Sequence, residues 1–240
     1  MSVFWLFYFL VSILIVGSTL AYGVSLPFLI IGRLYHPAWV LAGRIFQSGV
    51  ALLMKGQPWF NAKIDIVLPK APFVTLSNHR SHLDMFILLA MIPNIRVIAK
   101  HTLFYIPFLG FMMRLLKNIP IRKGDLDSYW KALETVKRAL KEKDPVHIFP
   151  EMTRCSAEFN GIQSFQLAPF HALLSSGVPI IPILFRGTDK VWPKGQLGLH
   201  YRRPVLVRSL STIDPSQFKT AEELRDHVHQ QLLKEWNDGA

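Results

Sequence analysis

Beyond Pro58, short apolar runs alternate with amphipathic stretches, and this alternation constrains the fold more than any other feature of the chain. Such alternation of strand-like and helix-like segments is typical of an α/β domain. The clearest helix is predicted over 127–142, where apolar residues recur at spacings of three and four and the opposite face is charged. The whole pattern predicts strands over 63–68, 73–76, 95–99, 118–121, 146–149, 180–185 and 205–210, and helices over 82–91, 108–116, 127–142, 164–175 and 220–236.

The first 60 residues differ in composition from the rest of the chain. They contain three basic residues, Arg33, Arg44 and Lys55, and no Asp or Glu. Residues 1–32 lack Asp, Glu, Lys, Arg and His altogether, and about 20 apolar residues of helix are enough to cross a bilayer core. No Lys or Arg precedes this run, which disfavours a cleaved secretory signal. We therefore expect a retained membrane segment.

The second apolar stretch, residues 37–54, carries Arg44 in its middle. An arginine at mid-bilayer is costly, so this stretch is expected to lie in the membrane interface or to pack back on the first. The nearby positive charge follows the first apolar run, which places the later residues in the cytoplasm. A helical hairpin embedded in the cytoplasmic leaflet and a single span both fit. We predict membrane-associated helices over 1–57 and one further domain over 58–240.

The chain is strongly basic. Residues 61–240 hold 24 Lys and Arg against 16 Asp and Glu, a net charge of +8 out of the total of +11. Such a surface suits nucleic acid, an anionic membrane face or a phosphorylated substrate. Nucleic acid is the least favoured of these, because the basic residues are dispersed and no stacking-aromatic motif accompanies them. The lone Cys155 excludes an intramolecular disulfide and agrees with a reducing compartment.

A cluster of polar residues, Asn78-His79-Arg80-Ser81-His82-Leu83-Asp84, directly follows the predicted strand at 73–76. If Asn78 closes the strand and a helix begins near Ser81, Asp84 can reach back to one imidazole nitrogen of His79. The other nitrogen is then free to take a proton from a substrate hydroxyl, and the imidazole pKa near neutrality suits that task. The alternative is structural, with a capping histidine and an aspartate that interacts with the helix dipole.

Two other kinds of chemistry are conceivable for the same cluster. His79, His82 and Asp84 have a spacing that a metal allows, but no further Cys, His or Glu lies nearby in the sequence to complete a site. Ser81 does not sit in a Gly-x-Ser-x-Gly elbow, which disfavours a serine nucleophile. We therefore expect no metal and no serine nucleophile.

A second polar cluster, Pro150-Glu151-Met152-Thr153-Arg154, follows the predicted strand at 146–149. A loop at that point would present Glu151 and Arg154 at the same rim of a sheet. An arginine can hold a phosphate through two hydrogen bonds, and a glutamate can accept hydrogen bonds from hydroxyls. The alternative is a local salt bridge between the two side chains.

Together these stretches resemble the 1-acyl-sn-glycerol-3-phosphate acyltransferase (lysophosphatidic acid acyltransferase) family. The family's Asn-His-x4-Asp pattern is met by Asn78, His79 and Asp84, and its Phe-Pro-Glu-Gly-Thr-Arg pattern by residues 149–154. The intervening and later family elements are matched, in order, by Lys100, Pro107-Phe108-Leu109-Gly110, Arg122 and Val178-Pro179-Ile180-Ile181-Pro182-Ile183.

Three positions depart from the family pattern. Met152 replaces a glycine, Thr102 replaces a frequent glutamate, and the family arginine aligns with either Arg122 or Lys123. A glycine with positive φ cannot be replaced by methionine without strain, so the turn that holds Glu151 is in question. These departures bear on the acceptor lipid more than on the chemistry.

The resemblance implies the glycerolipid acyltransferase fold, an α/β fold with a central, mostly parallel sheet flanked by helices, preceded by a membrane-embedded helical hairpin. It implies transfer of a fatty acyl chain from acyl-CoA or acyl carrier protein to the sn-2 hydroxyl of 1-acyl-glycerol-3-phosphate, at the cytoplasmic face of the membrane. No cofactor is implied beyond that co-substrate. An acyltransferase for another lysolipid, or a non-catalytic module that binds anionic membranes, are the alternatives.

The same resemblance assigns roles to individual residues. His79 is the general base and Asp84 holds and polarises it. The expected substrate-binding residues are Arg122, Arg154 and Lys100 for the acceptor phosphate, Glu151 for the glycerol hydroxyls, and Thr153 and Asn78.

Overall fold

The computed structural model describes residues 8–13, 48–49, 61–106, 109–156, 158–196, 198–200 and 202–238. Seven strands form one sheet in the order β1-β7-β6-β2-β5-β3-β4. Their bounds are β1 Asn61–Asp65, β2 Val74–Ser77, β3 Arg96–Lys100, β4 Ile119–Ile121, β5 Val146–Ile148, β6 Ile180–Arg186 and β7 Pro204–Ser209. Each lies within three residues of a strand that the apolar runs predict.

Most of the sheet is parallel. Strands β6, β2, β5, β3 and β4 all run in one direction. Strand β7 is antiparallel to β6, and the edge strand β1 pairs in parallel with β7, so β1 and β7 run the opposite way. The expected central, mostly parallel sheet is therefore confirmed. The carboxyl ends of β2, β5, β3 and β4 meet at one edge of the sheet, which is called the carboxyl edge below.

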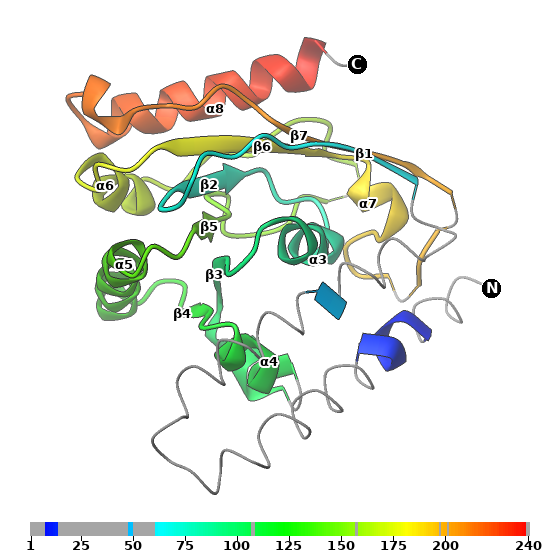
Figure 1. Ribbon diagram of the computed structural model, residues 1–240. Coiled ribbons are helices and arrows are strands. Elements are labelled where there is room, and N and C mark those ends of the chain that lie inside the picture. The colour runs from blue at the N-terminus through cyan, green and yellow to red at the C-terminus, as the bar shows by residue number, and fades with distance from the viewer. Residues whose placement is uncertain are drawn as a thin grey trace, which may run out of the picture.

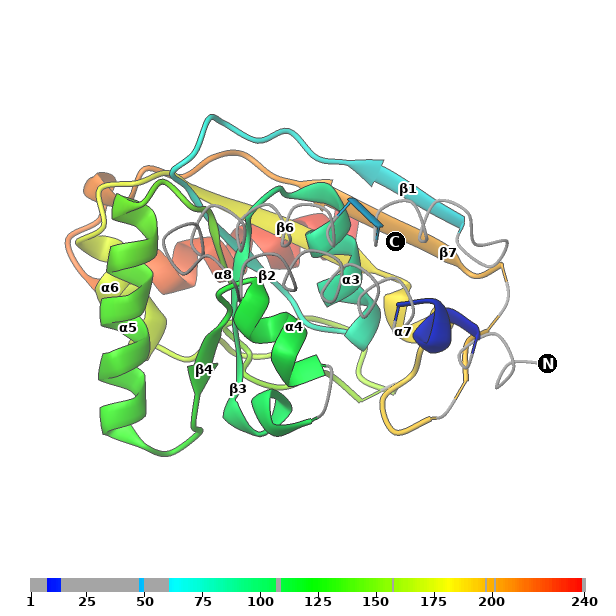
Figure 2. The same ribbon diagram turned by 60° about the horizontal axis from the view of Figure 1, so that its bottom comes forward.

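All five predicted helices are present. They are α3 His82–Met91, α4 Leu109–Leu115, α5 Leu126–Lys141, α6 Ala168–Leu174 and α8 Ala221–Asp238. The short segments η1 His101–Tyr105, α7 Thr188–Val191 and η2 Pro215–Gln217 were not predicted, because each is too short to show a helical period. Figure 2 shows α5 beside β4 at one end of the sheet and β1 at the other end.

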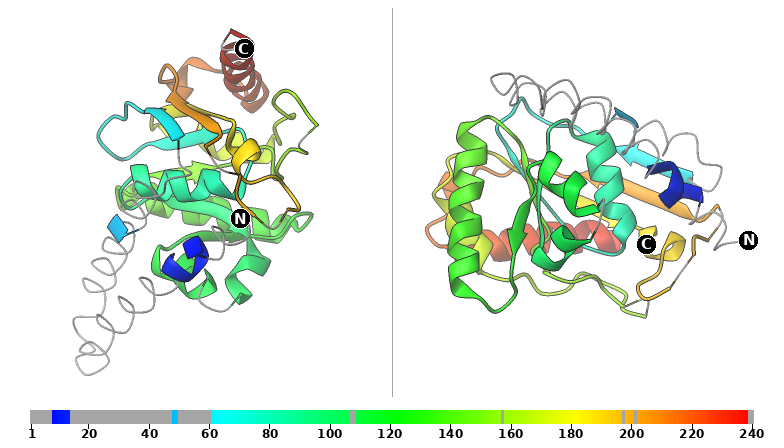
Figure 3. Two further views of the ribbon diagram at one scale, coloured as in Figure 1. Left: turned by 90° about the vertical axis from the view of Figure 1, so that its right-hand side faces the viewer. Right: turned by 90° about the horizontal axis from the view of Figure 1, so that it is seen from below.

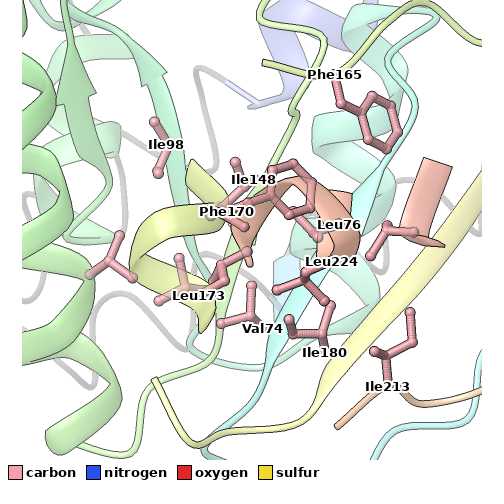
Figure 4. Close-up of a cluster of buried hydrophobic side chains, with 14 of the residues drawn as sticks. Val74, Leu76, Ile98, Ile148, Phe165, Phe170, Leu173, Ile180, Ile213 and Leu224 are labelled. Atoms are coloured by element: carbon pink, nitrogen blue, oxygen red, sulfur yellow. The ribbon is translucent and has the colours of Figure 1, made fainter. Parts of the chain in front are cut away.

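Helices cover both faces of the sheet. Helix α8 lies across one face, and α3 and α4 lie on the other (Figure 1; Figure 3, right). On the α8 face, side chains of alternate strand residues pack against α5, α6 and α8 in a fully apolar cluster. Figure 4 shows part of this cluster, in which Val74, Leu76 and Ile180 from the strands meet Phe170, Leu173 and Leu224 from the helices.

The opposite face is packed against α3 and α4. There Ile181, Ile183 and Phe185 of β6 join apolar residues of α3 in a second cluster. The alternation of β6 residues between the two clusters is the period of two that a strand buried on both faces requires. Phe9, from the helical stretch at 8–13, is fully buried in the same cluster and packs edge-on against Phe86 with ring centroids 5.2 Å apart.

The predicted membrane hairpin falls almost wholly on residues outside the described parts of the chain. Among the residues that are described, no helix has both the length and the apolar character needed to traverse a bilayer. The membrane segment and the domain division at residues 57 and 58 remain predictions.

Candidate active site

The His79 imidazole and the Asp84 carboxylate meet at the carboxyl edge of the sheet. His79 Nδ1 lies 2.9 Å from Asp84 Oδ2. The contact arises because β2 ends at Ser77 and α3 begins at His82, so the four residues between them turn back on the first turn of the helix. With Nδ1 engaged by the carboxylate, Nε2 is the nitrogen left to exchange a proton with a substrate. The predicted pairing of the two side chains is present.

Asp84 is fully buried at the amino end of α3. Its Oδ2 also accepts hydrogen bonds from the backbone N–H groups of Arg80, at 2.7 Å, and Ser81, at 2.9 Å. Ser81 completes a capping box with Asp84, and its hydroxyl accepts from the Leu83 N–H. Two fixed backbone donors and a helix amino terminus stabilise the negative charge of the carboxylate. Asp84 therefore caps helix α3 and contacts His79 at the same time, so the two interpretations of this cluster are compatible.

Phe149 fixes the plane of the His79 ring. The two rings are stacked with centroids 3.9 Å apart and an angle of 25° between their planes. Phe149 directly follows β5, the neighbour of β2 in the sheet. His79 keeps 18% of its side chain exposed, whereas Asp84 is completely covered. The imidazole is thus held on one face by Phe149 and at Nδ1 by Asp84, and remains open to a reactant.

Behind Phe149 lies a second, wholly buried histidine that the sequence did not single out. His147 Nδ1 is 2.8 Å from Thr75 Oγ1, and His147 Nε2 is 3.2 Å from Ser77 Oγ. The Ser77 hydroxyl donates to the Asn78 carbonyl, so it accepts from Nε2–H, and Thr75 donates to Nδ1. Burial lowers the pKa of His147 well below its ordinary value, which agrees with this neutral tautomer. The ring of His147 packs edge-on against Phe149, 4.3 Å between centroids.

Glu151 ties the second polar cluster to the first. Its Oε1 accepts from the backbone N–H of His79 at 3.1 Å, and its Oε2 accepts from Gln163 Nε2 at 2.6 Å and the Cys155 thiol at 3.3 Å. The His79 carbonyl in turn accepts from the Cys155 N–H at 3.0 Å. Both carboxylate oxygens are thus engaged inside the protein, with no contact to Arg154. This geometry favours a positioning role for Glu151 over the expected binding of glycerol hydroxyls.

Burial makes Glu151 a weaker acid. It raises the pKa of this carboxyl to about 7, against the lowering effect of its hydrogen bonds from Gln163, Cys155 and His79. The folded protein therefore binds more protons here than the unfolded chain between about pH 4.5 and pH 7, and its stability falls as the pH rises through that window. Above the window the full cost of a buried carboxylate is present, roughly 3 kcal/mol.

Replacement of Glu151 by Gln is expected to remove this pH dependence. The unfolding free energy of Glu151→Gln, relative to the unchanged protein, should rise by up to about 3 kcal/mol from pH 5 to pH 8. Denaturant unfolding at both pH values measures it, with Glu158→Gln, an exposed residue of the same loop, as the control. A difference that is constant with pH would contradict the assignment.

Met152 adopts the backbone conformation that the family glycine suggests. Its φ is 55°, in the left-handed region, which costs a residue with a side chain on the order of 1 kcal/mol. Met152 therefore places a side chain at a backbone position that a glycine would adopt without strain.

Arg154 lies within electrostatic range of the acid–base pair. Burial lowers its pKa, and the charge of Asp84 partly offsets this. Desolvation first, and then the charge of Arg154, lower the pKa of His82 to about 4, so His82 is neutral at physiological pH. No described residue hydrogen-bonds to the Arg154 guanidinium, which leaves its donors available. Thr153, beside it, is exposed.

The remaining predicted residues fall in two different places. Lys100 ends β3 and Arg122 follows β4, both exposed at the carboxyl edge and separated from β2 by one and two further strands. Asn78 is fully buried, and its side-chain amide exchanges two 2.8 Å hydrogen bonds with the backbone of Phe185. Asn78 therefore joins the ends of β2 and β6, and the substrate contact that the resemblance implies stays a prediction. Pro107 and Phe108 lie outside the described residues.

Arg80 is a structural centre that the sequence did not reveal. Its guanidinium forms a 2.6 Å ion pair with Asp189 of α7 and donates to the carbonyls of Phe159 and Gly161. It also lies over the Trp236 ring of α8, 4.9 Å from its centroid. The residue after His79 thus holds together α7, α8 and the loop that follows Arg154. Its place inside the Asn78–Asp84 cluster was the only available signal.

The described parts of the chain contain no group of three or more His, Cys, Asp and Glu side chains arranged to hold a metal ion. The His82 ring lies against Trp192, 5.3 Å between centroids.

A mostly parallel sheet whose carboxyl edge carries a buried carboxylate, an accessible imidazole and an arginine is suited to acid–base chemistry on an anionic substrate, and comparison with known proteins gives the class. An acyltransferase family model matches residues 61–186. The 1-acyl-sn-glycerol-3-phosphate acyltransferase of Saccharomyces cerevisiae is 30% identical, covering 92% of this chain and 76% of its own. A chloroplastic 1-acyl-sn-glycerol-3-phosphate acyltransferase of Arabidopsis thaliana is 31% identical over 74% of this chain. The matched region spans about half, 52%, of the length of that relative.

A solved structure supports the fold independently. The crystal structure of the 1-acyl-sn-glycerophosphate acyltransferase of Thermotoga maritima aligns with a TM-score of 0.69, covering 92% of this chain and 97% of its own at 22% identity. The chain belongs to the 1-acyl-sn-glycerol-3-phosphate acyltransferase family.

Proposed function

We propose that this protein transfers a fatty acyl chain from the thioester of acyl-CoA or acyl carrier protein to the sn-2 hydroxyl of 1-acyl-glycerol-3-phosphate, producing phosphatidic acid for phospholipid biosynthesis. The observation that carries the proposal is the 2.9 Å contact between His79 Nδ1 and the buried Asp84, which leaves Nε2 as the base. Family membership supplies the class of reaction.

The proposed chemistry is a direct transfer. His79 Nε2 takes the proton of the acceptor hydroxyl. At the same time the hydroxyl oxygen attacks the carbonyl carbon of the thioester and forms the new C–O bond. Asp84 stabilises the resulting imidazolium through Nδ1. When the C–S bond breaks, the departing thiolate accepts this proton from Nε2. The ester and the free thiol are released, and the enzyme returns to its starting state.

No acyl-enzyme is required, and the candidate nucleophiles near the site are engaged elsewhere. The Ser81 hydroxyl donates to the Trp192 carbonyl at 2.8 Å and accepts from Leu83. Cys155 is almost wholly buried, and burial together with the charge of Glu151 raises its pKa to about 11. A thiol with so high a pKa is a poor nucleophile at neutral pH.

The acceptor phosphate is proposed to bind Arg154, with Lys100 and Arg122 as further cations at the carboxyl edge and Thr153 as a hydroxyl donor. Residues 1–57 are proposed to hold the enzyme on the cytoplasmic face of the membrane, where its lipid acceptor resides. Glu151 and Asn78 are proposed to act by positioning His79 and the end of β2.

One assay tests the function directly. The purified full chain in detergent is incubated with labelled oleoyl-CoA or oleoyl-acyl carrier protein and a panel of lysolipids with and without a terminal phosphate monoester. We expect labelled phosphatidic acid as the main product. Transfer only to another lysolipid would redirect the proposal to that acceptor, and the absence of any transfer would favour the non-catalytic membrane module.

The same assay tests the phosphate contact. Because a charge-assisted hydrogen bond contributes about 1.5–3 kcal/mol, Arg154→Ala should raise the apparent KM for lysophosphatidate roughly 10- to 100-fold with a smaller change in kcat. Arg225→Ala removes an equivalent charge from α8, where Arg225 pairs with Asp226 at 2.7 Å, and is the matched control. An unchanged KM in Arg154→Ala would place the phosphate elsewhere.

A further inference from the structure

Three large apolar side chains are exposed where η1 passes into α4. The exposed fractions are 72% for Tyr105, 46% for Ile106 and 39% for Leu109. Soluble proteins seldom gather exposed apolar residues in this way without a partner. We call these three residues the η1–α4 cluster. Figure 2 shows the end of β3 passing into this region beside α4.

The backbone beneath this cluster is closely packed. The Gly110 N–H donates to the Ile106 carbonyl at 2.8 Å, and a Cβ at position 110 would lie 2.0 Å from the Phe104 carbonyl oxygen. Only glycine allows η1 and α4 to approach this closely. Below the cluster, Phe104 and Met113 are buried. The exposed side chains are therefore held on a defined surface.

The segment around the cluster is rich in cations, two of which, Arg96 and Lys117, pair with Glu142. Residues 85–124, which contain β3, η1, α4 and β4, include six Lys and Arg and no Asp or Glu. Three of these cations, Lys100, Arg122 and Lys123, are exposed at the ends of β3 and β4, the two strands that η1 contacts. Apolar side chains bordered by cations match the two layers of an anionic lipid surface, acyl chains and headgroups.

This surface lies on the same edge of the sheet as the candidate site. Strands β2, β5, β3 and β4 are parallel neighbours, so Lys100 at the end of β3 and Arg122 just after β4 lie on the side where His79 and Glu151 follow their strands. A lipid acceptor that stays in the bilayer would therefore have its headgroup near the acid–base pair when the η1–α4 cluster is in the membrane.

We propose that the η1–α4 cluster inserts into an anionic lipid surface and is a second membrane contact, separate from residues 1–57. The inference rests on the proposed function for its biological meaning, since a membrane-resident acceptor explains why the contact adjoins the site. A second copy of this chain fits less well. A two-fold interface would bring Lys100, Arg122 and Lys123 of one copy against the same cations of the other.

The lone cysteine makes a direct test practical, because Cys155 is only 1% exposed and a new surface cysteine can be labelled selectively. The full-length variant Ile106→Cys carries an environment-sensitive fluorophore and is reconstituted in phosphatidylglycerol and phosphatidylcholine vesicles, with and without nitroxide-bearing lipid. The control is Val67→Cys, because Val67 is 75% exposed and follows β1, the opposite edge strand.

We expect a blue shift at position 106 and nitroxide quenching about threefold stronger than at position 67, with the difference reduced in pure phosphatidylcholine. Equal quenching at both positions, or none at 106, would overturn the proposal. A blue shift at 106 that appears without vesicles and grows with protein concentration would also overturn it, in favour of self-association. These outcomes do not depend on turnover, so acyl transfer to micellar lysolipid reports on the proposed function separately.

Discussion

The variant His79→Ala is expected to lose acyl transfer by on the order of 10³-fold in kcat while retaining its fold. The loss follows because Nε2 of this imidazole is the proposed proton acceptor and no other described base is held against a carboxylate beside it. The fold should survive because the His79 side chain is partly exposed and helix α3 is capped by Ser81 and Asp84. Single-turnover transfer of labelled acyl groups, together with circular dichroism, measures both quantities.

A control variant at another histidine tests whether the loss of activity is specific to position 79. His171 is exposed on α6, on the face of the sheet away from α3, and His171→Ala should keep its activity. Substantial turnover in His79→Ala would remove the general-base role and with it the direct-transfer mechanism.

The second large effect is expected at Asp84, where two substitutions separate charge from hydrogen bonding. Asp84→Asn can keep one oxygen where Oδ2 accepts from His79, Arg80 and Ser81, but it removes the negative charge that stabilises the imidazolium. We expect kcat to fall on the order of 10²-fold or more with the midpoint of thermal unfolding little changed.

The companion variant Asp84→Ala removes all three acceptor contacts. It should lose activity to a similar extent and also lower the unfolding free energy by about 1–2 kcal/mol, because the capping box of α3 is broken. Kinetics and denaturant unfolding of the two variants are compared side by side. If Asp84→Asn were as active as the unchanged enzyme, Asp84 would be a capping residue alone.

The architecture was largely predictable. Every predicted strand and helix is present, because strands buried on both faces are short continuous apolar runs and helices covering them show a period near 3.6. The largest boundary difference is at α6, predicted from residue 164 and beginning at Ala168. Gln163 and Gln166, just before it, are held by Glu151 and the Pro150 carbonyl instead of by helical bonds.

The site was only partly predictable. The His79–Asp84 contact joins residues five positions apart and follows from a strand end and a helix start, so local spacing was enough to infer it. The contacts of Glu151 with the His79 N–H, of Asn78 with Phe185 and of Arg80 with Asp189 join residues 72, 107 and 109 positions apart. No local pattern encodes such pairs, since they depend on which strands become neighbours in the sheet.

By itself, then, the sequence determined the α/β class, the positions of its elements and the contact between His79 and Asp84, because each of these depends on side-chain period and short-range geometry. Only the tertiary structure decided that Glu151 accepts from the His79 N–H and Asn78 bonds to Phe185, that Arg80 joins α7 to α8, and that the η1–α4 cluster adjoins the carboxyl edge. The physical reason is that burial and long-range hydrogen bonding are consequences of strand order, which a single sequence does not display.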